Sequence, residues 1–175
     1  MLISDYDYQL PDDLIARYPT ALRRDSRLLE LSDDIHDRAF SDFSDLLRAG
    51  DLLVFNDTRV IKARLVASKE TGGRAEILIE RIRSERTAMA HVRASKSPRS
   101  GGRLLLADGV VATVKGRQGG LYVLEFSDDI LPFLERQGEV PLPPYLERDA
   151  DLTDAERYQT VYAKEPGAVA APTAG

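Results

Sequence analysis

A run of four polar residues at positions 56–59, Asn-Asp-Thr-Arg, brings an amide, a carboxylate, a hydroxyl and a guanidinium together between two apolar segments. The apolar run before it, residues 52–55, is contiguous, which is typical of a strand covered on both faces. Asn-Asp supplies the turn chemistry that ends such a strand. We therefore expect residues 50–65 to form a strand, a polar turn and a second strand. The turn would place its polar side chains where a ligand can meet them.

The same four residues also have a purely structural interpretation. Asn56 and Asp57 can hydrogen-bond their own backbone, as Asn and Asp in turns commonly do. Arg59 can form an ion pair with Asp57 or with Asp51. The four residues by themselves are compatible with both interpretations.

The composition excludes several kinds of site. With 43% hydrophobic and 30% charged residues, the 175-residue chain can bury a core as one domain or two small ones. It has no cysteine, which excludes a disulfide framework, a thiolate zinc site and a cysteine nucleophile. The two histidines, His36 and His91, are far apart and predict neither a metal site nor a Ser-His-Asp triad. The start lacks a signal peptide and no run approaches the roughly 18 apolar residues of a membrane span, so we expect a cytoplasmic protein.

The charge is distributed unevenly along the chain. Residues 58–117 hold 14 Lys and Arg against 5 Asp and Glu, although the net charge of the whole chain is −5. A basic face on an acidic body would let a protein of low pI hold a polyanion. The alternative is a solvated strand surface that carries many ion pairs.

The pattern of elements predicts an α+β protein. Short strands at roughly ten-residue spacing, separated by Gly-containing turns at 71–73, 108–109 and 119–120, predict a small antiparallel barrel. A short helix over 130–136 that ends at Gly138 follows the barrel, with Pro132 in its first turn. We expect a mixed α/β body, discontinuous and incomplete, at 1–65 and 143–175. The inserted barrel with its connector would occupy 66–142, which includes most of the basic segment.

The last ten residues, Pro-Gly-Ala-Val-Ala-Ala-Pro-Thr-Ala-Gly at 166–175, are nearly all small. Small residues let the backbone come close to a bulky ligand and leave N–H groups free to bind it. The Ala-Val-Ala-Ala run also indicates a strand that belongs in a sheet. We interpret this segment as an active-site loop at which the chain is interrupted; a flexible tail is the alternative.

Taken together, these segments resemble the S-adenosylmethionine:tRNA ribosyltransferase-isomerase family of queuosine biosynthesis. The resemblance rests on NDTRV at 56–60, ARL at 63–65, RYQTVYA at 157–163 and PGAVAAPTAG at 166–175. DSRLL at 25–29, GDLLVF at 50–55 and VPLPPY at 140–145 support it. Members of the family continue for about as many residues again past the PTAG motif, so the chain resembles an N-terminal portion. It also departs from the family at Lys62, where proline is usual.

The resemblance implies an activity, a fold and partners. The enzyme would transfer and isomerise the ribosyl group of S-adenosylmethionine onto the 7-aminomethyl-7-deazaguanine of tRNA. Epoxyqueuosine-tRNA would form, and adenine and methionine would leave. The implied fold is an α/β body with an inserted β-barrel. S-adenosylmethionine is then a co-substrate and tRNA the partner; we expect no cofactor, no metal, no membrane association and a monomer.

The resemblance also suggests roles for individual residues. The sulfonium acidifies the ribose 5′ carbon, so the reaction needs a base there and an acid near the departing adenine. Asp57 is the candidate for the base, and Tyr158 or Tyr162 for hydrogen bonding or proton donation. Arg59 and Arg64 would hold the methionine carboxylate or an RNA phosphate by bidentate contacts. The full substrate-binding set is Asn56, Thr58, Arg59, Arg64, Arg157, Gln159, Thr160, Gly167, Thr173, Ala174 and Gly175.

Two other classes of protein are compatible with the sequence. A truncated, non-catalytic tRNA-binding module would bind tRNA in a salt-sensitive manner without binding S-adenosylmethionine. Its aromatic residues near the basic segment are few, Tyr122 and Phe126, which favours backbone contacts over base stacking. A structural or interaction domain would show neither activity, and its unpaired sheet edge would mark an assembly surface.

Overall fold

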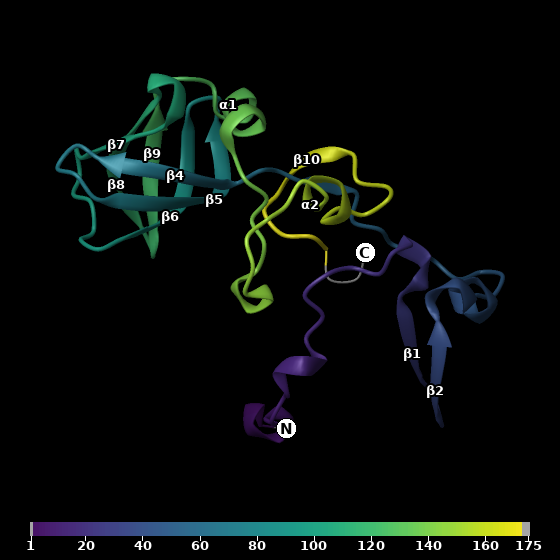
Figure 1. Cartoon of the computed structure of the whole chain (residues 1–175). Coiled ribbons are helices and arrows are strands. Elements are labelled where there is room, and N and C mark those ends of the chain that lie inside the picture. The colour runs from purple at the N-terminus through teal and green to yellow at the C-terminus, as the bar shows by residue number, and fades with distance from the viewer. Residues whose placement is uncertain (1, 173–175) are drawn as a thin grey trace. The chain divides into compact units, whose positions relative to one another are not determined.

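The computed structural model of the chain describes residues 2–172 and contains two compact units (Figure 1). The first unit comprises the chain before Asn56 together with Pro144–Arg148. The second comprises Asn56–Pro143 and the described residues from Asp149 onward. The barrel and the α-helices that the structure describes, α1 (Ile130–Gln137) and α2 (Asp154–Arg157), belong to the second unit.

The first unit is built on a two-stranded antiparallel hairpin. Strand β1 (Arg27–Leu31) pairs with β2 (Ile35–Ala39), and the turn between them is closed by the Ser32 N–H, which donates to the Asp34 carbonyl at 3.1 Å. The 3₁₀ helix η4 (Phe40–Leu46) follows. The rest of this unit's regular structure is 3₁₀, in η1 (Ile3–Tyr6), η2 (Asp12–Leu14), η3 (Arg23–Asp25) and η6 (Pro144–Leu146).

Residues 144–148 return to the first unit through contacts with Arg17 and Tyr18. The Arg17 guanidinium donates to the Tyr145 carbonyl and pairs with Glu147 at 3.1 Å. The Arg148 Nε donates to the Arg17 carbonyl at 2.7 Å, and its guanidinium lies 4.3 Å from the centroid of the Tyr18 ring. These contacts explain why the unit is discontinuous in sequence.

The strand expected at residues 52–55 does not form. Leu52 and Val54 are each 86% exposed, and residues 51–57 have no regular secondary structure. A doubly covered strand needs hydrogen-bonded neighbours and a packed layer on each face. Within residues 2–172 no strand pairs with this run, so the prediction is wrong for the described structure. Regular structure begins at Thr58, where a partner strand is available.

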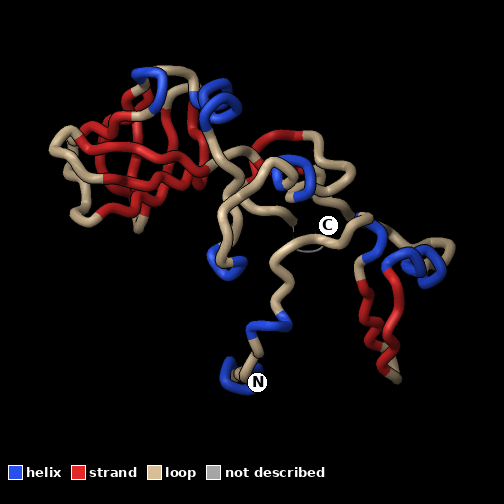
Figure 2. Tube along the Cα trace, viewed as in Figure 1, coloured by secondary structure: helices blue, strands red, loops and turns tan. Residues whose placement is uncertain are grey.

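The second unit contains the closed antiparallel barrel that the spacing of turns predicts. Its strand order is β4-β5-β6-β9-β8-β7, and Figure 2 shows that strands make up most of this part of the chain. Closure pairs every edge, so the barrel presents no open sheet edge. The strands are β4 (Arg64–Lys69), β5 (Arg74–Ser84), β6 (Thr87–Ala94), β7 (Arg103–Leu105), β8 (Val111–Gln118) and β9 (Leu121–Phe126), with the 3₁₀ turn η5 (Ala107–Gly109) between β7 and β8.

The barrel core continues into helix α1. Alternate residues of β5, Ala75, Ile77 and Ile79, are fully buried, as period-two patterning requires. Helix α1 adds Phe133 and Leu134 to the same core. The helix prediction is confirmed, because Pro132 stands in the first turn and Gly138 is the C-terminal cap.

The link between residues 60 and 64 packs tightly against the end of α1. The Lys62 ammonium donates to the Glu135 carbonyl at 2.8 Å, which suits the negative end of a helix. A Cβ atom added at Gly138 would lie only 2.1 Å from the Lys62 carbonyl oxygen and 2.6 Å from that of Leu134. Gly138 therefore permits an approach that any side chain would prevent.

The structure also bears on membrane insertion. None of the helices formed by residues 2–172 combines the length and the apolar character that crossing a bilayer requires.

Gly138→Ala should destabilise the second unit by about 1–3 kcal/mol, because the added methyl group forces the Lys62 backbone away from α1. Gly120→Ala is the matched control, since a Cβ atom there meets no atom within 4 Å. Chemical denaturation of both variants measures the difference. Equal stability of the two variants would contradict the tight approach.

Candidate functional site

Two short parallel strands bring distant candidate residues together. Strand β3 (Thr58–Val60) pairs with β10 (Glu165–Ala168), so that Thr58 lies opposite Glu165 and Arg59 opposite Pro166. The register shifts between Pro166 and Ala168, which leaves Gly167 at a bulge. The polar run at 56–59 and the small-residue segment that begins at Pro166 are therefore neighbours.

The turn before β3 is fixed by hydrogen bonds. The Asn56 Oδ1 accepts from the Thr58 N–H at 3.0 Å and from its Oγ1 at 2.6 Å, which is an Asx turn. The Asp57 carbonyl accepts from the N–H groups of Lys164 and Glu165 at 2.7 and 3.2 Å. The Asn56 side chain thus closes its own turn, as the structural interpretation expects.

The side chains of Asp57 and Arg59 are exposed. They do not pair with each other, and within residues 2–172 no other side chain forms an ion pair with either. A carboxylate and a guanidinium are thus presented to solvent from a turn whose backbone is fixed. Both groups are therefore available to a ligand, as are the exposed side chains of Lys164 and Glu165 beside them.

Gln159 holds the other edge of β3. Its side-chain Oε1 accepts from the Val60 N–H and its Nε2 donates to the Val60 carbonyl, both at 2.8 Å. Val60 is buried, so neither backbone group can bond to bulk water instead. The next residue, Ile61, donates its N–H to the Ala168 carbonyl at 2.9 Å on the β10 side. Strand β3 is thus bonded along both edges, by a side-chain amide and by a strand.

Two carboxylates, of Asp151 and Asp154, accept hydrogen bonds at the start of helix α2, which precedes Gln159. The Asp151 Oδ1 accepts from the Thr153 N–H and Oγ1 at 2.8 and 2.6 Å, and the buried Asp154 Oδ2 accepts from the Asp151 N–H at 2.8 Å. This arrangement resembles a capping box. The hydrogen bonds from Thr153 hold the pKa of the Asp151 carboxyl below its ordinary value. The ionised cap fixes the start of the helix that leads to Gln159.

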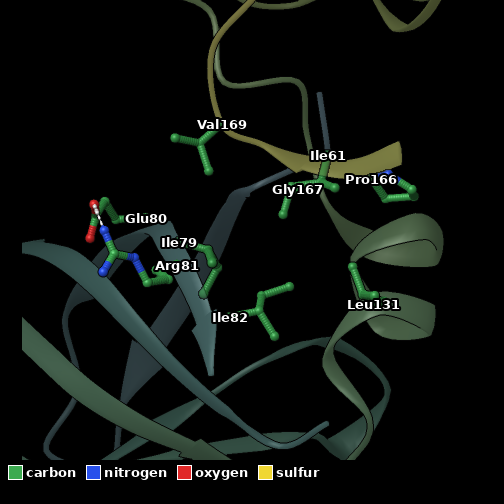
Figure 3. A pocket seen from close by; sticks show the side chains of 9 residues that line it. All are labelled: Ile61, Ile79, Glu80, Arg81, Ile82, Leu131, Pro166, Gly167 and Val169. Carbon is green, nitrogen blue, oxygen red and sulfur yellow. Dashed lines mark ion pairs between the residues drawn. The ribbon is translucent and has the colours of Figure 1, made fainter. Parts of the chain in front are cut away.

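A cavity of about 400 Å³ lies beside the β3–β10 pair (Figure 3). Ile61, Gly167 and Val169 line it from the strand pair, and residues 79–82 of β5 line it from the barrel. Seven of the nine lining residues are uncharged, and the other two, Glu80 and Arg81, form an ion pair of 3.8 Å. A Cβ atom at Gly167 would meet nothing within 4 Å, so the backbone there faces open space. The volume falls within the range of small-molecule pockets.

Other candidate residues lie on β4 and in and after helix α2. Arg64 lies on β4, where its Nε is 3.3 Å from Glu76 Oε1 and its Nη2 donates to the Leu142 carbonyl at 3.0 Å, so it holds the connector to the barrel. Arg157, Tyr158, Thr160 and Tyr162 are half-buried in α2 and the segment that follows it. Thr173, Ala174 and Gly175 lie outside the described residues.

The sequence did not predict the residues that line the cavity from the barrel side. The residues concerned include Ile79, Arg81 and Ile82 of β5 and Leu131 of α1. One signal was present, because two successive charges, Glu80-Arg81, interrupt the alternation of β5. The register of β5 against β6 shifts at that place.

Comparison with known proteins gives the class to which the chain belongs. The model of a family described as queuosine biosynthesis protein matches residues 3–175, so the chain belongs to that family. The resemblance carried by the motifs is thereby confirmed.

Particular relatives are identical to the chain at more than half of the aligned positions. The S-adenosylmethionine:tRNA ribosyltransferase-isomerase of Aromatoleum aromaticum is 56% identical over 178 residues, covering 100% of this chain and 52% of the relative. That of Herminiimonas arsenicoxydans is 55% identical over 174 residues, covering 99% and 51%. The chain thus spans about half the length of the curated relatives it matches. A crystal structure of S-adenosylmethionine tRNA ribosyltransferase from Thermotoga maritima is 31% identical, covers 82% of this chain and 52% of its own, and gives a TM-score of 0.41.

Gln159→Leu should destabilise the second unit, because it leaves two buried backbone groups of Val60 without partners, at about 1–3 kcal/mol for each group. Gln118→Leu, at an exposed position near the end of β8, is the matched control. Urea denaturation followed by circular dichroism gives both free energies of unfolding. If the Gln159→Leu variant were as stable as the control, Gln159 would not hold β3.

Proposed function

We propose that this chain supplies the β3–β10 site of an S-adenosylmethionine:tRNA ribosyltransferase-isomerase. The reaction would transfer and isomerise the ribosyl group of S-adenosylmethionine onto the 7-aminomethyl-7-deazaguanine of tRNA, with release of adenine and methionine. The observation that carries the proposal is the family match over residues 3–175, joined to relatives of 55% and 56% identity that bear this name.

The geometry supports a site of this kind at the turn before β3. S-adenosylmethionine carries a carboxylate, a sulfonium and a purine, so its site needs a cation, an anionic or polar group and an apolar pocket. Arg59 and Asp57 present the two charges from neighbouring positions, and the cavity beside Gly167 has apolar side chains such as Ile61 and Val169 in its lining. We assign the methionine carboxylate or a phosphate to Arg59, and close backbone approach to Gly167.

Asp57 is the proposed base. The sulfonium withdraws electrons from the ribose 5′ carbon, and a carboxylate close to that carbon can remove a proton from it. Adenine leaves more readily when it receives a proton, which Tyr158 or Tyr162 would donate. Asn56 contributes by closing the turn that carries Asp57, and Gln159 by fixing the strand that follows. Thr58, Arg157, Thr160, Thr173, Ala174 and Gly175 remain proposed substrate-binding residues.

Arg64 has the weakest support among the proposed residues. Its guanidinium is already engaged by Glu76 and by the Leu142 carbonyl. A substrate phosphate or carboxylate would have to displace one of these contacts. We therefore place the anion-binding role on Arg59 and expect Arg64 to act through the connector.

Adenine release tests the activity. Because the chain spans about half of its relatives, the test protein is a chimera in which this chain replaces the matching half of the Aromatoleum aromaticum relative. Chromatography should detect adenine when S-adenosylmethionine and tRNA carrying the aminomethyl-deazaguanine are both present, and none without tRNA. A folded chimera that releases no adenine, beside an active parent enzyme, would contradict the proposal.

Asp57→Asn in the chimera should lower the rate of adenine release about 100-fold or more, because it removes the proposed general base and preserves the size of the side chain. Asp33→Asn, in the exposed turn between β1 and β2, serves as the control and should leave the rate unchanged. Turnover of the Asp57→Asn chimera at the parental rate would remove Asp57 from the chemistry.

A further inference from the structure

The two ends of the barrel differ in how far their charges are balanced by ion pairs. One end is formed by the β4–β5 turn, the segment between β6 and β7, and the β8–β9 turn, as the pairs Ser68–Arg74, Ala75–Ala94 and Gln118–Leu121 show. We call it the basic end. Its charged residues are Lys69, Arg74, Arg93, Lys96, Arg99, Arg103 and Arg117, against two acids, Glu70 and Glu76, of which Glu76 lies opposite Arg93 on the neighbouring strand.

The opposite end of the barrel is rich in acids. The β5–β6 turn meets the start of α1 there, where the Ile130 N–H donates to the Glu85 carbonyl at 2.8 Å. The ion pairs at this end are compact, with Arg86 to Asp129 at 3.0 Å and Arg136 to Asp128 at 2.9 Å. The charges of the acidic end are thus largely neutralised within the protein.

Most cations of the basic end lack such partners. Arg103 pairs with Glu70 at 2.9 Å, and Arg117 stacks 4.2 Å from the centroid of the Tyr122 ring. For the other five no ion pair is formed with any residue the structure describes; they are Lys69, Arg74, Arg93, Lys96 and Arg99. Like charges held close together repel one another, and a bound polyanion would relieve that repulsion.

A groove of about 330 Å³ crosses the basic end between the β4–β5 turn and residues 95–102. Lys69, Lys96, Arg99 and Arg103 all line it. Glu70 lines it as well and pairs with Arg103 at 2.9 Å. The other three cations on this concave surface focus a positive potential there. The groove is thus a candidate for binding a chain of phosphates.

The loop that carries Lys96 and Arg99 is fixed against the barrel. The Gly101 N–H donates to the Val114 carbonyl at 2.8 Å, and the Val114 N–H donates to the Gly102 carbonyl at 2.9 Å. A Cβ atom on Gly102 would lie 2.9 Å from the Arg99 carbonyl oxygen, so the turn needs glycine there. The cations therefore lie on an ordered loop, so binding does not lose the conformational entropy that ordering the loop would cost.

We propose that the basic end of the barrel binds the sugar–phosphate backbone of RNA, with Lys96 and Arg99 contacting phosphates. The identity of that RNA as the tRNA substrate rests on the function proposed above. No aromatic residue lines the groove among the described residues, and Tyr122, which Arg117 contacts, is buried. Aromatic side chains on which bases could stack are therefore few here. Contacts to phosphates would fix the position of the RNA without reading its sequence.

The double substitution Lys96→Gln and Arg99→Gln tests the proposal in the 175-residue chain. The affinity for an unmodified tRNA transcript is measured between about 50 and about 200 mM salt. Loss of two phosphate contacts should weaken binding about tenfold or more at the middle of this range and lower the slope of log K against log salt by about 1.5. Arg86→Gln with Arg136→Gln, at the acidic end, removes the same charge and should leave the slope unchanged.

Charge rescue completes the binding test. Arg99→Lys keeps the positive charge and should retain most of the affinity, whereas Arg99→Gln should not. Circular dichroism confirms that each variant is folded. The proposal is overturned if the wild-type chain does not bind tRNA, if the Lys96→Gln and Arg99→Gln variant keeps the wild-type slope, or if the acidic-end variant loses as much affinity.

The chimera separates this proposal from the function on which it rests. An active chimera whose KM for tRNA is unchanged by Lys96→Gln and Arg99→Gln would refute the binding surface and support the activity. An inactive chimera that loses salt-dependent RNA binding through the same two substitutions would support the surface and refute the activity.

Discussion

The described site depends on the hydrogen bonds that strand β3 makes along both of its edges. A three-residue strand has too few backbone bonds to persist by itself. It persists here because β10 pairs with one edge and the Gln159 amide bonds both polar groups of Val60 on the other. The Asx turn of Asn56 then fixes the direction in which Asp57 and Arg59 leave the strand. Each of these bonds joins a different segment of the chain to the same three residues.

The same strand links this turn to the barrel. Residues 61–63 run from β3 to β4 against the end of α1, where Lys62 caps the helix and Gly138 permits the close approach. One side of the cavity beside Gly167 is therefore made by the strand pair and the other by β5 and α1. The barrel contributes a wall of the proposed ligand site as well as the basic end, so in the proposed function it would contact the substrates in two different places.

Local patterns predicted much of the fold, and contacts distant in sequence explain what they missed. Glycine turns and alternation indicated the barrel, and Pro132 with Gly138 indicated α1, because each depends on neighbouring residues. The run at 52–55 was wrongly taken as a buried strand, since an apolar run does not show what covers it. Gln159 is hydrogen-bonded to Val60, which lies 99 positions away in the sequence. A glutamine at that position does not by itself predict which residue it will bond. The cavity wall at Arg81 and Ile82 likewise depends on how β5 lies against β10.

The most direct measurement of the central claim is the change in backbone amide shifts of the ¹⁵N-labelled 175-residue chain on addition of S-adenosylmethionine. If the turn before β3 and the bulge of β10 form the ligand site, the largest changes fall on Asp57, Arg59 and Gly167. The amide of Val60, held by Gln159, should keep its protection from exchange throughout the titration. The account would be contradicted if binding were saturable but changed only the shifts of other parts of the chain. It would also be contradicted if none of these amides shifted.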